Sequence, residues 1–160
     1  MCIRDRPEAF HHGEKVNLRQ FEQDWPRVST FVFSENNEYA WVTASNPKKN
    51  LLLGYIWKTE EYPWINFWRD MENGQPKSFG MEFGTTGLHE PMPIVAKKGK
   101  IFNRNIYDFI DSEEIVRKSF TAFLSEIPDD YLGVADVEIN SSMFCIKELN
   151  STRDIKYKFK

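Results

Sequence analysis

The sequence lacks the features that mark several classes of protein. Its two cysteines, Cys2 and Cys145, are too few for a disulfide framework or a zinc site. No apolar run approaches the roughly 18–20 residues needed to span a bilayer. Acidic residues outnumber basic ones by 24 to 21, so the basic excess typical of nucleic-acid binding is missing. We therefore expect neither a membrane nor a nucleic acid as the partner of this chain.

Motifs for cofactors are also missing from the sequence. It has no glycine-rich loop that could cradle a phosphate and no metal-binding signature. His11 and His12 with Glu14 could in principle ligate a metal, but adjacent histidines more often lie on the surface. No Ser-His-Asp arrangement can be argued from residue order. The sequence thus indicates no metal or organic cofactor.

Aromatic residues, in contrast, are abundant, at 15% of the chain. Short β-prone runs separated by turn residues predict strands over most of the sequence. The segment 30–33, the polar stretch 35–38 and the segment 39–43 together predict a hairpin. The continuous apolar run 51–57 predicts a strand buried on both faces. Residues 71–77 read as a loop and 78–84 as the next strand.

The second half of the chain contains one ambiguous segment. Residues 112–126 fit both a helical and a strand pattern, whereas Pro91 and Pro93 are expected to keep their stretch extended. Three strands are predicted at 134–139, 143–149 and 154–159, and the strict alternation of the last predicts one solvated face. About eight strands and at most one helix predict a mainly β fold, an antiparallel β-sandwich.

The first six residues look foreign to the protein. They back-translate to ATG TGT ATA AGA GAC AGG, a string that resembles a transposon end used in sequencing libraries. We interpret residues 1–6 as adapter read-through and residues 7–160 as the C-terminal part of one domain, truncated at its N-terminus. The alternative is a short disordered N-terminus. The compartment and the oligomeric state are left open.

Aromatic and polar side chains are interleaved most densely between Trp57 and Pro91. A sugar ring stacks its C–H face on an aromatic ring while polar side chains hydrogen-bond its hydroxyls, so this composition fits a carbohydrate site. The candidate substrate-binding residues are Trp57, Trp64, Trp68, Arg69 and His89. The competing interpretation of each tryptophan is a core residue.

Glu82 is the candidate catalytic residue. In a strand it faces opposite to Met81 and Phe83 and shares its face with Gly80 and Gly84, which leaves open space beside the carboxylate. A carboxylate placed there is a candidate general base, whose pKa burial would raise. The alternative is an outward-facing glutamate on an exposed strand face.

Three runs, 53–57, 62–68 and 80–87, resemble the C-terminal half of aldose 1-epimerase (galactose mutarotase)-like proteins. The resemblance covers roughly residues 30–150, and its specific motifs are a proline-aromatic strand start followed by a glutamate-bearing strand. It implies a large antiparallel supersandwich and a small-molecule carbohydrate as substrate. It also implies that Glu82 takes a proton from the anomeric hydroxyl while an imidazole protonates the ring oxygen, so that the ring opens and recloses.

The family's histidines lie earlier in the chain than Glu82, and nothing in the family pattern makes His89 the acid. We therefore keep three interpretations of function open: an aldose 1-epimerase-like isomerase, a non-catalytic carbohydrate-binding sandwich, and an accessory sandwich domain of a larger carbohydrate-active enzyme. Which sugar is bound is not determined by the sequence.

Overall fold

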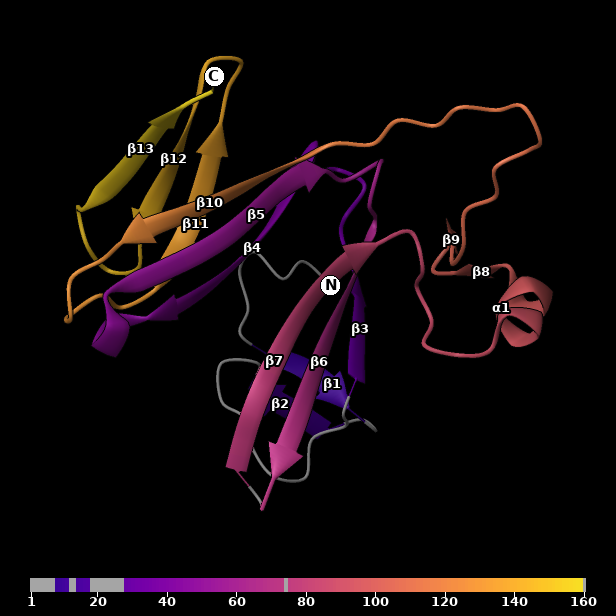
Figure 1. Cartoon of the computed structure of the whole chain (residues 1–160), viewed down its shortest axis with the longest axis horizontal. Coiled ribbons are helices and arrows are strands. Elements are labelled where there is room, and N and C mark those ends of the chain that lie inside the picture. Colours follow the sequence, from indigo (N-terminus) through magenta and orange to yellow (C-terminus); the bar gives the residue numbers. More distant parts are fainter. Residues whose placement is uncertain (1–7, 12–13, 18–27, 74, 160) are drawn as a thin grey trace. The chain divides into compact units, whose positions relative to one another are not determined.

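The computed structural model describes residues 8–11, 14–17, 28–73 and 75–159. The chain is mainly β, with antiparallel pairing in every described ladder and one short α-helix (Figure 1). It divides into two compact units, which we describe separately: unit 1 comprises residues 1–38 and 58–119, and unit 2 comprises residues 39–57 and 120–160. The adapter assignment of residues 1–6 lies outside the described residues, and the expectation of a single domain stays a prediction. No helix in the described ranges is long and apolar enough to cross a bilayer.

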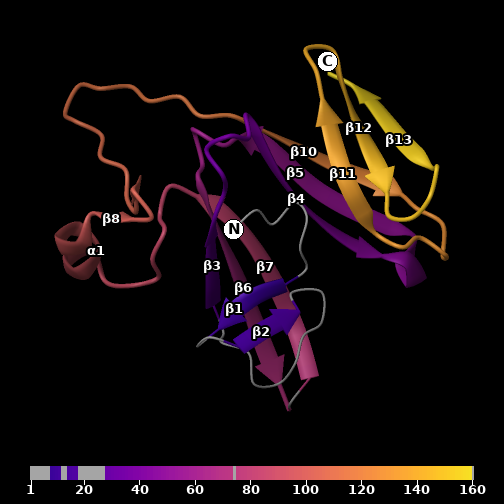
Figure 2. The ribbon, with the colours of Figure 1, turned by 180° about the vertical axis from the view of Figure 1, so that it is seen from behind.

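Unit 1 is built around a three-stranded sheet in the order β3-β6-β7, whose strands lie side by side in Figure 2. Its strands are β3 (Val28–Val32), β6 (Trp64–Glu72) and β7 (Gln75–Gly84). The other elements of the unit are β1 (Glu8–His11), β2 (Glu14–Asn17), α1 (Met92–Lys98), β8 (Lys100–Ile101) and β9 (Arg104–Asn105). β1 pairs with β2, and β8 with β9.

Unit 2 contains two three-stranded sheets, in the orders β10-β5-β4 and β11-β12-β13. The first is made of β4 (Tyr39–Asn46), β5 (Leu51–Lys58) and β10 (Phe120–Glu126), with the 3-10 helix η2 (Pro47–Lys49) between β4 and β5. The second is made of β11 (Val134–Ile139), β12 (Met143–Glu148) and β13 (Asp154–Lys158).

Both sheets of unit 2 contribute to one hydrophobic core. Its buried members are Leu52, Ile56, Phe123, Ile127, Tyr131, Val137, Phe144 and Ile146. A methyl group on Gly54 would overlap the Phe123 ring, so the ring lies directly on the backbone of the central strand β5. Tyr131 brings a hydroxyl into this core with no hydrogen-bond partner, and burial raises the pKa of Tyr131 to about 12.

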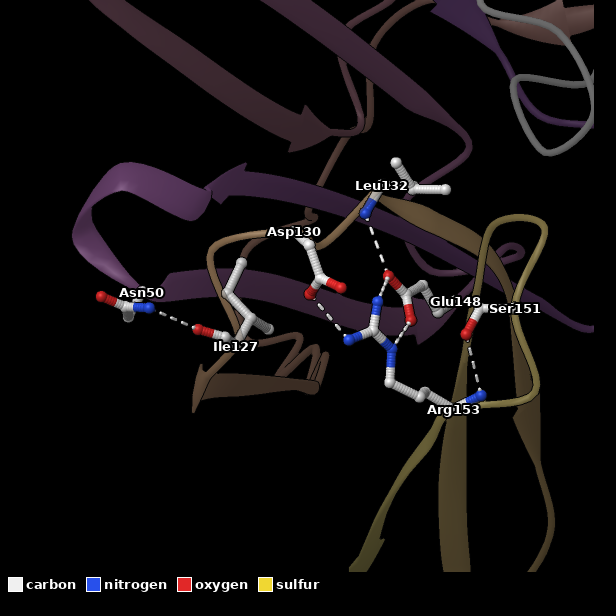
Figure 3. A network of polar contacts seen from close by, with 7 residues as sticks. All are labelled: Asn50, Ile127, Asp130, Leu132, Glu148, Ser151 and Arg153. Carbon is white, nitrogen blue, oxygen red and sulfur yellow. Dashed lines mark hydrogen bonds and ion pairs between the residues drawn. The ribbon is translucent and has the colours of Figure 1, made fainter.

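A polar network fixes the turns at one end of unit 2 (Figure 3). Glu148 is buried, and its carboxylate accepts hydrogen bonds from Nη2 of Arg153 at 2.8 Å and from the backbone N–H of Leu132 at 3.0 Å, besides one from Nε of Arg153. Burial by itself would raise the pKa of Glu148, but the bonds from Arg153 and Leu132 outweigh it and hold that pKa below its usual value. Asp130 accepts a further bond from the same guanidinium at 2.8 Å. The carboxylate is thus buried but fully compensated.

Unit 1 has a smaller cluster at one end of its sheet. Trp64, Val95 and Ile106 are its buried members. The indole N–H of Trp64 donates to the carbonyl of Asn105 at 2.7 Å, and the ring packs against Gly87, where a methyl group would overlap it. This contact joins β6 to the segment that follows β7.

The predicted hairpin of residues 30–33 with 39–43 is wrong. The turn itself forms, since Asn37 N–H donates to the Ser34 carbonyl at 3.2 Å, but it joins strands of different sheets. β3 pairs with the distant strand β6, bringing Phe31 opposite Ile65, whereas β4 lies beside β5. Long-range apolar pairing outcompeted the local partner.

Two further predictions about the strands need correction. β5 alternates between buried and less buried residues up to Ile56, so it is not buried on both faces. The loop predicted at residues 71–77 is a tight connection, because β6 runs to Glu72 and β7 begins at Gln75. Asn73 takes a left-handed φ of 53° there, which asparagine tolerates better than most residues.

The prolines around position 92 do not keep the chain extended. α1 begins at Met92, with Pro93 in its first turn, where a missing N–H breaks no helical hydrogen bond. The ambiguous segment 112–126 is a strand in its second half, β10. The three C-terminal strands are confirmed within one residue, and β13 alternates as predicted. Cys145 is buried in β12, and burial raises the pKa of its thiol.

Candidate functional site

One face of the β3-β6-β7 sheet brings several predicted site residues together. The strand registers place them in three rows across the sheet. The rows are Val28-Trp68-Gly80, Thr30-Asn66-Glu82 and Val32-Trp64-Gly84. We call these nine residues the glycine face. Its middle row is polar, and each of the outer rows pairs a tryptophan with a glycine.

The side chains of the middle row are ordered by hydrogen bonds. The Thr30 hydroxyl donates to Oδ1 of Asn66 at 2.7 Å, and Nδ2 of Asn66 donates to the carbonyl of Thr86 at 3.5 Å. These bonds fix which way the Asn66 amide faces. Glu82 stands next in the row, opposite Asn66 on β7, and its side chain is exposed. Of the two alternatives for Glu82, the exposed glutamate is therefore the one found, and burial is excluded.

Trp68 and Glu82 border the same space above Gly80. A Cβ atom on Gly80 would lie 3.4 Å from Cε3 of Trp68 and 3.7 Å from Oε1 of Glu82. The Trp68 side chain is 37% exposed. Because Gly80 has no side chain, an aromatic surface and a carboxylate oxygen are accessible on two sides of one small space. The open space predicted beside Glu82 is thus partly occupied by the Trp68 indole.

Trp64 lies on the same face, but it is buried and takes part in the core cluster of unit 1. At this end of the face, the segment that carries Asn105 covers the indole. A ring enclosed in this way has no free surface on which a sugar could stack. Trp64 therefore marks the end of the accessible part of the glycine face.

The remaining predicted residues lie elsewhere. Trp57 is buried in β5 and belongs to unit 2. Arg69 is buried on the opposite face of β6, since it pairs with Phe79 rather than with a residue of the glycine face. His89 is exposed in the segment between β7 and α1. Within unit 1 the structure therefore unites Glu82 with Trp68 and places Arg69 on the opposite face of the sheet.

Sequence reasoning missed two polar members of the face. Asn66 could have been found, because strand alternation places it on the same face as Trp64 and Trp68. Thr30 could not, because its position beside Asn66 depends on the pairing of β3 with β6, which the sequence pattern did not reveal.

No group of three or more histidine, cysteine, aspartate or glutamate side chains that could hold a metal occurs among the residues the structure describes. Comparisons with protein families, with curated proteins and with solved structures found no match for this chain. The geometry of the glycine face is therefore the main indication of what this chain does.

Proposed function

We propose that this chain binds carbohydrate on the glycine face of unit 1. Trp68 would stack against the C–H face of a sugar ring, while Glu82 and Asn66 exchange hydrogen bonds with its hydroxyls. The observation that carries this proposal is the shared space above Gly80, bordered by a partly exposed indole and a carboxylate oxygen. Carboxylate and amide groups suit this role because sugar hydroxyls both donate and accept hydrogen bonds.

The second candidate function is anomer interconversion of the kind catalysed by aldose 1-epimerase-like proteins. It is favoured by Glu82, an accessible carboxylate beside an aromatic ring. The resemblance assigns this position to the family's general base. A general acid is still required, and no residue of the glycine face is a histidine. The finer fold assignment, a mutarotase-like sandwich truncated at its N-terminus, belongs to this second proposal, as does an accessory role in a larger carbohydrate-active enzyme.

Binding is tested with isotopically labelled full chain titrated with neutral mono- and oligosaccharides by NMR. We expect chemical-shift changes at Trp68, Asn66 and Glu82. Trp68→Ala should weaken binding about tenfold, since aromatic stacking and its buried area contribute on the order of 1–2 kcal/mol. The matched control is Phe79→Ala, because Phe79 is similarly exposed, at 39%, but lies on the opposite face of the sheet. Equal losses in both variants would rule out the glycine face.

Glycine substitutions give a test that leaves the polar groups in place. Gly80→Ala fills the space between Trp68 and Glu82 at ordinary contact distances, so we expect weaker binding without loss of stability. Gly84→Ala is the control, because its new methyl group meets only the Thr86 nitrogen, at 3.9 Å.

Catalysis is tested separately by polarimetry or NMR of a freshly dissolved sugar anomer. If the second candidate is right, Glu82→Gln should slow interconversion by about 10²–10⁴-fold while sugar binding persists. If the original chain binds sugar but does not accelerate anomer interconversion, the binding function stands and the isomerase function is ruled out.

A further inference from the structure

A second candidate site lies in unit 1, in a polar cavity of about 460 Å³. It forms where three segments distant in sequence meet: residues 35–38, residues 58–60 and β9. Two contacts hold these segments together. The Thr59 N–H donates to the Glu38 carbonyl at 2.9 Å, and Nε of Arg104 pairs with Oε1 of Glu35 at 3.0 Å. No residue of the glycine face lines this cavity, within the residues the structure describes.

Thr59 gives the cavity a polar group that the described residues do not satisfy. Its side chain is 2% exposed, and its hydroxyl has no hydrogen-bond partner. An unsatisfied buried hydroxyl destabilises a fold, so such a group calls for an explanation. A hydroxyl both donates and accepts. Because the Thr59 oxygen has almost no accessible surface, a ligand hydroxyl would satisfy it only after the charged side chains that line the cavity move aside.

The other lining residues specify the chemistry of a ligand. The charged side chains are Glu35, Glu38, Glu60, Lys58 and Arg104. With three carboxylates against two cations, the lining has one net negative charge, and it includes no aromatic or aliphatic residue. The lining offers no aromatic or aliphatic residue to an apolar ligand, and its net charge disfavours an anion. Closely spaced donors and acceptors suit a ligand with several hydroxyls, and the negative excess favours an ammonium group.

We propose that this cavity is a binding site for a small polyhydroxylated ligand, and that it prefers an amino sugar to a neutral sugar and a neutral sugar to a sugar acid. Its volume falls in the range of small-molecule sites, at roughly 300–1,000 Å³. The Thr59 hydroxyl would bond a ligand hydroxyl, and Glu38 and Glu60 would attract the ammonium group. This proposal does not depend on the function of the glycine face.

The experiment titrates the labelled full chain with D-glucosamine, D-glucose and D-glucuronate at mildly acidic pH, where the amine is charged. We expect glucosamine to bind about threefold to tenfold more tightly than glucose, with glucuronate weakest, as one net charge near the surface allows. Shifts should centre on residues 58–60 and Arg104. The preference should shrink as salt is added.

Thr59→Val is the decisive variant. Because it replaces an unsatisfied buried hydroxyl by a methyl group of similar size, we expect an unchanged or higher melting temperature together with at least a tenfold loss of glucosamine binding. A threonine without a role in binding would show the same melting temperature but no loss of glucosamine binding. Thr152→Val, in an exposed turn of unit 2, is the control and should change neither property.

One further variant completes the test. Glu60→Gln removes the negative excess without disturbing the backbone and should reduce the preference for glucosamine over glucose. Shifts at residues 58–60 and Arg104 are followed separately from shifts at Trp68 and Glu82, which separates this cavity from the glycine face. The proposal is overturned if glucosamine causes no shifts at residues 58–60 and Arg104, or if those shifts are unchanged in Thr59→Val.

Discussion

Unit 2 buries residues from both of its three-stranded sheets in one core, whereas the three-stranded sheet of unit 1 keeps a partly exposed tryptophan and a polar row on its glycine face. The two units also differ in the surroundings of a glutamate side chain. Glu148 of unit 2 is buried and compensated by Arg153, while Glu82 of unit 1 is exposed beside an open space. If the glycine face binds carbohydrate as proposed, recognition belongs to unit 1.

The two units share one packing feature, an aromatic ring that lies against a glycine. In each, an aromatic ring lies directly on a glycine, Phe123 on Gly54 in unit 2 and Trp64 on Gly87 in unit 1. In unit 2 the ring belongs to a cluster of eight buried residues, and in unit 1 to a cluster of three. The same substitution can therefore be made in both units to compare what each ring supports.

The largest effect is expected for Gly54→Ala. The new methyl group overlaps the Phe123 ring, which must leave its place in the core, at a cost of about 3 kcal/mol in the free energy of unfolding. Amide hydrogen exchange, followed residue by residue, should show faster opening of unit 2. Equal acceleration in unit 1 would show that the two compact units do not open independently.

A somewhat smaller effect is expected for Gly87→Ala. Displacing the Trp64 indole disturbs the smaller cluster and lengthens its bond to the Asn105 carbonyl, for about 2 kcal/mol. Gly84→Ala, three residues earlier, has open space around its methyl group and serves as the control. Amide hydrogen exchange should now accelerate in unit 1. Acceleration confined to unit 2 would show that the Trp64 ring does not stabilise unit 1.

The smallest effect comes from the polar network of unit 2 and depends on pH. Because the pKa of Glu148 is lower in the folded chain, its stabilising contribution is present above the unfolded pKa of about 4.3 and is lost as the pH falls through the folded value. Arg153→Met should lower the free energy of unfolding near neutral pH by less than Gly87→Ala does, since the buried carboxylate loses its partner.

In Arg153→Met, burial of Glu148 is no longer outweighed by the guanidinium, so the carboxyl should protonate at a higher pH and part of the lost stability should return on acidification. Urea unfolding of both proteins from neutral pH to about pH 2 measures this, because the loss in the original chain lies below the unfolded pKa. The original chain should lose stability over the acidic part of that range. Parallel curves would show that the Glu148 network does not govern the acid response of unit 2.

Prediction from the sequence succeeded where the signal was local. Alternation along residues 154–159 gave the solvated face of β13, and alternation around Glu82 placed it with Gly80 and Gly84. It failed where partners were distant. The polar turn at 35–38 forms, yet β3 pairs with β6 instead of β4. The segment around Pro93 is helical, and its Val95 packs in one cluster with the distant residues Trp64 and Ile106.

The candidate site shows the same limit. Trp57, Trp64 and Trp68 look alike in the sequence, but only the last is partly exposed beside Glu82. Composition cannot separate them, because each tryptophan has the same hydrophobic area to bury and only its neighbours decide whether it does so.

The sequence by itself determined the mainly β character, the C-terminal strands and the face on which Glu82 stands, since these follow from the two-residue period of the strand backbone. The tertiary structure alone decided which strands pair, that Glu82 is exposed, and that Thr59 is buried in a polar cavity without a partner. Those properties depend on contacts between segments tens of residues apart, whose energies are shared by many side chains and are not readable from any one stretch of sequence.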